Sequence, residues 1–123
     1  MYLDTHVVIW LYEKDEDRIS RRVRELIENS DLLVSPMVLL ELEYLFETGR
    51  IKTRAAEIYD YLHDTIQLDV CGKPFAAVAR KSIGVKWTRD PFDRLITAQA
   101  AVDESPLLTK DDTIHTYYPE AVW

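Results

Sequence analysis

Short apolar runs alternate with longer helical patterns along the chain, and this alternation limits the folds that the sequence can adopt. Apolar runs of strand length lie at residues 2–3, 31–35, 65–70 and 106–109, and the closing EAVW is a candidate edge strand. Segments with apolar residues at helical spacing lie between them, at 17–29, 37–48, 52–63 and 73–82 among others. Strands that alternate with helices form βα units, and such units build parallel sheets covered by helices. The pattern therefore predicts an α/β fold.

Length and composition restrict the class of protein further. The 123 residues are expected to form one domain, spanning 1–123, with a core of its own. A single cysteine, Cys71, excludes an internal disulfide and fits a reducing compartment. The apolar runs are too short to cross a bilayer, and Asp4 stands where a signal peptide would be apolar. We expect a cytoplasmic protein without a membrane partner.

Acidic residues follow the predicted strands at the edge where parallel sheets bind ligands. Asp4 follows the first strand directly, and Glu41 lies about one and a half turns into the helix after the second. Asp90 and Asp93 open the helix of the segment TRDPFDRLITAQA, and Asp111 follows the last clear strand. Because ligand sites lie at the carboxyl ends of parallel strands, these acids are expected to share one rim.

Each acid also has a purely structural interpretation. Asp90 before Pro91 is a typical helix N-cap, with Asp93 three residues later favoured by the helix dipole. Asp4 is a candidate cap of the first helix, and Thr109 a candidate cap of the last. Glu41 fits this interpretation least, because it lies past the first turn with no basic residue at i±3 or i±4.

Capping explains the acids one by one but not their placement on one rim. Carboxylates brought together repel one another and raise their pKa values, and a hard cation removes that cost. An all-oxygen site suits Mg²⁺ or Mn²⁺, which polarise phosphate oxygens and activate water. The arrangement predicts metal-assisted phosphodiester hydrolysis. The net charge of -7 argues against a nucleic-acid partner unless carboxylates of this kind bind cations.

Four segments together span nearly the whole chain: YLDTHVVIWL, SPMVLLELEYLFETGRI, RDPFDRLITAQA and LLTKDD. In this order they resemble the PIN-domain ribonucleases and specifically the VapC-like toxins of toxin–antitoxin systems. The resemblance implies a three-layer α/β/α sandwich with a mainly parallel sheet. It also implies an endoribonuclease that uses Mg²⁺ or Mn²⁺, with RNA as substrate, an antitoxin as partner and a homodimeric state.

The resemblance assigns roles residue by residue. Asp4, Glu41, Asp93 and Asp111 match the family's catalytic acids, and Asp4, Asp93 and Asp111 its metal ligands. Asp90 matches an extra aspartate of the subfamily with DPFDR, which is a further candidate ligand.

Several other positions bear on the site. Thr5 and Thr109 match hydroxyl residues that support it. Leu45 and Leu40 depart from the lysine and tryptophan frequent in the subfamily, which puts substrate contacts near that helix in doubt.

Arg89 and Arg94 flank the two central aspartates and are candidates to bind RNA phosphates or to balance the acids. Their alternative role is that of solvated charges at a helix end.

Two other functions stay open at this point. One is a non-catalytic PIN-like module that binds RNA or protein, although a degenerate copy is expected to have lost at least one acid. The other is a phosphotransfer enzyme on an open α/β sheet. Haloacid-dehalogenase-like phosphatases carry Asp-x-Asp after the first strand, whereas this chain has His6 two residues after Asp4.

Overall fold

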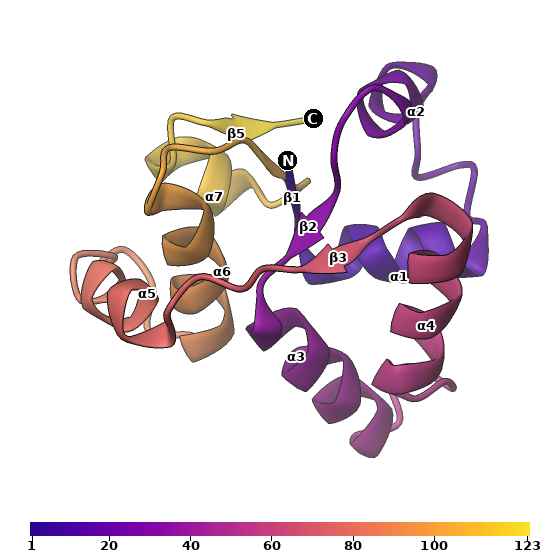
Figure 1. The fold of residues 1–123 in the computed structure, drawn as a ribbon, viewed down its shortest axis with the longest axis horizontal. Helices are drawn as coiled ribbons and strands as arrows, with labels where there is room; N and C mark the ends of the chain where they lie inside the picture. Colours follow the sequence, from indigo (N-terminus) through magenta and orange to yellow (C-terminus); the bar gives the residue numbers. More distant parts are fainter.

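The computed structural model describes all 123 residues and contains one five-stranded sheet (Figure 1). The strands run in the order β3-β2-β1-β4-β5, and every neighbouring pair is parallel. Their bounds are β1 (Tyr2–Leu3), β2 (Leu33–Val34), β3 (Asp69–Val70), β4 (Leu107–Leu108) and β5 (Ala121–Val122). The first strand therefore lies at the centre of the sheet, and the strand expected in EAVW is confirmed at its edge.

Seven helices cover this sheet. They are α1 (Thr5–Glu13), α2 (Arg21–Glu28), α3 (Pro36–Glu47), α4 (Ala55–Ile66), α5 (Phe75–Ser82), α6 (Pro91–Ala101) and α7 (Asp112–Tyr117). Figure 1 shows α1, α3 and α4 gathered on one side of the strands and α5, α6 and α7 on the other. The predicted α/β/α sandwich is confirmed. None of the helices is long and apolar enough to cross a membrane.

Side-chain caps fix where several of the helices begin. Asp4 and Asp90 cap α1 and α6 as the sequence predicts, and Ser35 caps α3. Pro follows the cap directly in α3 and α6. The prediction for the last helix is wrong, because its cap is Asp111 and not Thr109. Asp111 Oδ1 accepts a hydrogen bond from the Ile114 amide at 2.9 Å.

Two predicted element boundaries also differ from the structure. The strand expected at 65–70 shrinks to β3, because residues 65 and 66 complete the last turn of α4. Gln67 ends that helix in a left-handed conformation with φ 55, and its amide donates to carbonyls of the last turn. The helix expected from residue 17 begins at Arg21, because Ser20 caps it. Both shifts leave the order of the elements unchanged.

The sheet's central strands are buried on both faces. Tyr2, Leu3, Leu107 and Leu108 are each at most 1% exposed and belong to a cluster of 24 buried apolar residues. Such continuous burial is typical of a parallel sheet between two helical layers. The core thereby fixes the position of the strand ends, and the candidate site lies at that edge of the sheet.

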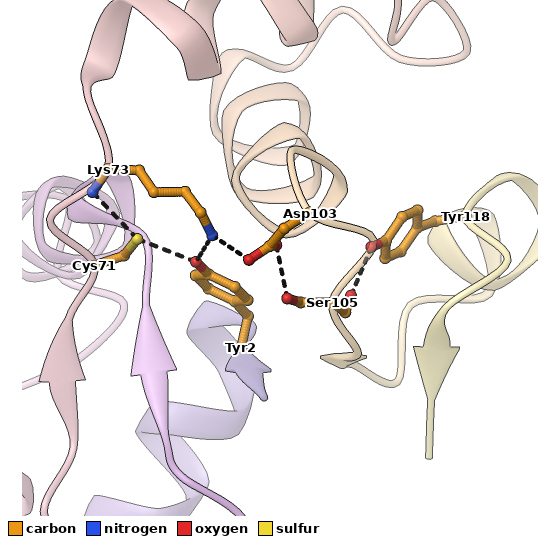
Figure 2. Close-up of polar contacts among 6 residues, drawn as sticks. All are labelled: Tyr2, Cys71, Lys73, Asp103, Ser105 and Tyr118. Carbon is orange, nitrogen blue, oxygen red and sulfur yellow. Dashed lines mark hydrogen bonds and ion pairs between the residues drawn. The ribbon is translucent and has the colours of Figure 1, made fainter.

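A polar network ties β1 to segments far away in the chain (Figure 2). The Tyr2 hydroxyl donates to Cys71 Sγ at 3.0 Å and accepts from Lys73 Nζ at 2.8 Å. Lys73 Nζ also donates to Asp103 Oδ2 at 2.6 Å. Burial of Lys73 opposes its charge, but the hydrogen bonds to Asp103 and Tyr2 outweigh it and raise the pKa of the ammonium. The network fixes the chain after β3 and the turn before β4 against the central strand.

Candidate active site

A groove of about 950 Å³ at the carboxyl edge of the sheet collects all five acids that the sequence singled out. Asp4 follows β1, Glu41 projects from α3, Asp90 and Asp93 open α6, and Asp111 follows β4. These positions are up to 107 residues apart in the chain, from 4 to 111. The predicted convergence on one rim is therefore what the structure shows.

Asp4 is the most deeply buried of these acids, at 7% exposed. Its Oδ1 accepts a hydrogen bond from the Thr5 amide at 2.8 Å, and its Oδ2 accepts one from the Thr109 hydroxyl at 2.7 Å. Burial raises the pKa of this carboxyl more than the two hydrogen bonds lower it. Thr109 therefore orients a carboxylate that has no cation near enough to form an ion pair.

Glu41 is partly buried and forms no ion pair within the chain. Burial raises its pKa, the nearby Thr5 hydroxyl lowers it, and the charges of Asp4 and Asp90 raise it again. The Thr5 hydroxyl lies near Glu41 but outside hydrogen-bonding geometry, so its oxygen is buried without a partner. A buried hydroxyl without a partner is costly, and this one lies close to the acids of the groove.

The pKa of Asp93 is raised strongly, and all four of the other acids contribute. Burial and then the charges of Asp90, Asp4, Glu41 and Asp111 raise the pKa of Asp93 to about 7. All four neighbours therefore lie within electrostatic range of one carboxyl. This coupling is the evidence that the five acids form one site.

Asp90 and Asp111 each have a structural task as well. Asp90 Oδ1 accepts a hydrogen bond from the Asp93 amide at 3.0 Å, as a helix cap does. Asp111 Oδ1 caps α7 in the same way. In both residues the second carboxylate oxygen has no hydrogen-bond partner in the chain. Each side chain can therefore cap its helix and still bind another ligand.

The five acids and the Thr5 hydroxyl offer only carboxylate and hydroxyl oxygens as metal ligands. Such ligands suit Mg²⁺ or Mn²⁺. No group of three or more His, Cys, Asp or Glu side chains is positioned ready to hold a metal ion. Burial first and repulsion between the carboxylates second raise the pKa values of Asp4, Glu41 and Asp93, and a cation would remove the repulsive part. The groove has the chemistry of a divalent-ion site but not the geometry of a finished cage.

Arg89 and Arg94, the predicted RNA-binding arginines, lie outside the lining of the groove. Arg89 is exposed and free of ion pairs. Arg94 instead donates from its guanidinium to the carbonyl oxygens of Ser82, at 3.1 Å, and Ile83, at 3.5 Å, and so caps the end of α5. Its geometry is that of a structural arginine.

Three basic side chains that sequence reasoning left out of the site line the groove: His6, Arg50 and Lys110. His6 and Lys110 each lie within two residues of a site aspartate, which was the available signal. Arg50 follows the end of α3, and no pattern in the sequence connects it with the acids. Trp10, which the sequence favours as a core residue, also contributes to the groove wall and contacts His6 at a ring distance of 6.2 Å.

Comparison with known proteins adds the decisive observation. The family model described as PIN domain matches residues 1–118 of the chain. The chain belongs to the PIN-domain family. The resemblance of the four sequence segments to this family is thereby confirmed.

Relatives of this PIN-domain protein match it over nearly its full length. Ribonuclease VapC22 of Mycobacterium tuberculosis is 30% identical over 127 residues, covering 98% of this chain and 96% of the relative. The crystal structure of VapBC2 from Rickettsia felis bound to a promoter DNA fragment superposes with a TM-score of 0.67 at 18% identity, covering 98% of this chain and 94% of that one. A toxin–antitoxin complex from Klebsiella pneumoniae gives 0.68 at 16% identity, covering 99% and 95%. The two structures support the fold.

Proposed function

We propose that this PIN-domain protein is a divalent-metal-dependent endoribonuclease and the toxin component of a toxin–antitoxin pair. The observation that carries the proposal is the convergence of five carboxylates in one groove, where burial and then the charges of the other four raise the pKa of Asp93 to about 7. The 30% identity to a protein named Ribonuclease VapC22 supports the same activity. The non-catalytic alternative does not explain why a full set of mutually repelling acids is retained.

The roles of the residues follow from their surroundings. Asp4, Asp93 and Asp111 would hold Mg²⁺ or Mn²⁺, with Glu41 and Asp90 completing the acidic set. The bound ion supplies charge for the phosphate oxygens and activates the attacking water. Thr109 holds Asp4 through its hydroxyl at 2.7 Å, and this contact fixes the orientation of that carboxylate. The Thr5 hydroxyl, buried without a partner beside Glu41, would help to position that carboxylate.

A further part of the proposal concerns partners. The similar structures are those of toxin–antitoxin complexes, which supports an antitoxin as the partner of this chain. The proposed state is a homodimer, with the whole chain as one domain acting on RNA in the cytoplasm. Exposed apolar side chains on α3 and α5, including Leu40, Tyr44 and Phe75, support contacts of this kind. Sedimentation of the purified protein measures the oligomeric state.

The decisive experiment measures cleavage of a labelled single-stranded RNA by purified protein with Mg²⁺, with Mn²⁺ and with excess EDTA. We expect cleavage with either ion and none with EDTA, because no histidine or cysteine arrangement offers a metal-free route. Asp93→Asn should abolish cleavage and growth inhibition, whereas Asp60→Asn, an exposed acid on α4, is the matched control and should retain both. Undiminished cleavage in EDTA contradicts the metal-dependent mechanism, and a folded wild type that cuts no RNA contradicts the enzyme.

A further inference from the structure

One stretch of this acidic chain, residues 80–89, carries positive charge that no acid neutralises. The chain has a net charge of -7, yet this stretch contains four basic residues and no acidic one. None of the four forms an ion pair within 4.0 Å. The basic residues are Arg80, Lys81, Lys86 and Arg89.

The other basic segment of the chain behaves differently. Around the start of α2, Arg18 pairs with Asp15, Arg21 with Glu25 and Arg24 with Glu16. Those three cations are balanced by acids of the same segment, although Arg22 between them is not. The stretch 80–89 differs because it contains no acidic residue at all.

The stretch leads directly to the acidic groove. It begins in the last turns of α5 and ends at Arg89, next to Asp90, which lines the groove. The guanidinium of Arg94 holds the end of α5 against α6 through the carbonyls of Ser82 and Ile83. The exposed cations are thus attached to the helix that presents Asp93.

An aromatic pair lies on the same approach. The rings of Trp87 and Tyr117 stack with centroids 5.4 Å apart and an interplanar angle of 5°. Trp87 packs against the small apolar cluster of Val78, Val85 and Ala98 and is thereby anchored. Tyr117 covers it from α7 and is 57% exposed, so one face of its ring is open to solvent. The pair is a rigid, flat, solvent-facing surface.

We propose that residues 80–89 together with Tyr117, the basic platform, bind single-stranded RNA beside the cleavage site. This rests on the proposed ribonuclease function. Single-stranded RNA is bound by aromatic rings that stack on bases and by cations that meet phosphates, and the platform offers both. An acidic groove repels a polyanion, so an adjacent cationic surface is what draws the strand in. Tyr117 stacks on a base, and Lys86 and Arg89 meet the phosphates on either side.

The test measures RNA binding separately from cleavage. Binding of a short fluorescent single-stranded RNA is followed by anisotropy in the Asp93→Asn background, which prevents cutting. Tyr117→Leu removes the aromatic face but keeps an apolar cover on Trp87, and it should weaken binding at least about fivefold. Tyr117→Phe should bind as the parent does. Melting curves confirm that both variants fold.

A second pair of variants tests the charges. Lys86→Gln combined with Arg89→Gln should lower the slope of log K against log salt by about 0.7 for each cation removed. Arg22→Gln, an exposed and unpaired arginine on α2, is the matched control and should leave the slope unchanged. In the cleaving background the platform variants should raise KM more than they lower kcat, because their residues lie outside the acidic groove.

The outcomes separate the platform from the proposed function. If the wild type cleaves RNA, but neither Tyr117→Leu nor the double variant changes RNA affinity, the platform is overturned and the enzyme is not. Binding that depends on Tyr117 without any cleavage supports the platform and overturns the enzyme. Dissociation of a dimer by Tyr117→Leu, with RNA affinity unchanged, shows a contact between copies instead and also overturns the platform.

Discussion

Replacing Asp93 by asparagine should stabilise the ion-free protein above neutral pH while it abolishes RNA cleavage. The reason is that burial and four neighbouring acids raise the pKa of Asp93 from 3.8 to about 7. A carboxyl whose pKa is raised on folding destabilises the folded state once it is ionised. The penalty is absent below the unfolded pKa of 3.8, grows as the pH rises, and is complete above about 7.

The magnitude follows from this shift. A rise of about three units corresponds to about 4 kcal/mol at 1.36 kcal/mol per unit. Asp93 is only half-buried, so screening by water reduces the penalty to about 2 kcal/mol. Asparagine loses up to about 1 kcal/mol of favourable interaction between the negative charge and the helix dipole. The net gain is about 1 kcal/mol, which raises Tm by about 3–6 °C for a chain of this length.

The assay compares Tm of wild type and Asp93→Asn in EDTA, near pH 4 and near pH 8, alongside RNA cleavage in Mn²⁺. The Tm gain should appear at the higher pH, where the wild-type carboxyl is ionised, and shrink or reverse at the lower. Addition of Mn²⁺ should raise Tm of the wild type more than that of the variant. A variant that is less stable near pH 8 and still cleaves RNA would mean that Asp93 only supports the start of α6.

Three further predictions follow from single contacts. Thr109→Val removes the hydroxyl that donates to Asp4 at 2.7 Å and should lower the free energy of unfolding by about 1–3 kcal/mol, measured by urea denaturation. Thr109→Ser, which keeps the hydroxyl, should recover most of the loss. Lys73→Met breaks the contact with Asp103 at 2.6 Å and should also destabilise the protein, by about 1–2 kcal/mol, whereas Lys52→Met in an exposed loop should not. The pKa of His63 is raised mainly by its hydrogen bond to a backbone carbonyl, so its stabilising effect is complete below pH 6.5 and lost as the pH rises through the raised value. His63→Gln should remove that part of the pH dependence of Tm, and an unchanged profile would contradict the assignment.

Local chemistry explains which parts of the site were predictable. A helix cap depends on one side chain and an amide two or three residues ahead, so Ser35 and Asp90 reveal their helices in the sequence alone. Asp4 and Asp111 follow apolar runs that can only be central strands, which places them at the carboxyl edge. Glu41 reveals itself as an acid in an apolar helix without a basic neighbour. The placement of the acids on one rim could therefore be predicted from short-range sequence patterns.

Contacts between segments that are distant in the sequence could not be predicted from such patterns. Each strand is two residues long, and its limits depend on pairing with neighbours far away in the chain, which is why the strand expected at 65–70 began too early. The bond from Thr109 to Asp4 joins residues 105 apart, so the sequence could not distinguish this role of Thr109 from a cap.

The sequence thus determined the order of the elements, the helix starts at most of the caps and the identity of the acids on the rim. Only the tertiary structure decided that Arg94 caps a neighbouring helix, that Tyr117 covers Trp87, and that burial together with the charges of four other acids raises the pKa of Asp93. The physical reason is that caps and periodicity are set by residues within one or two turns. Stacking and electrostatic coupling depend instead on distances that exist only once the helices have packed on the sheet.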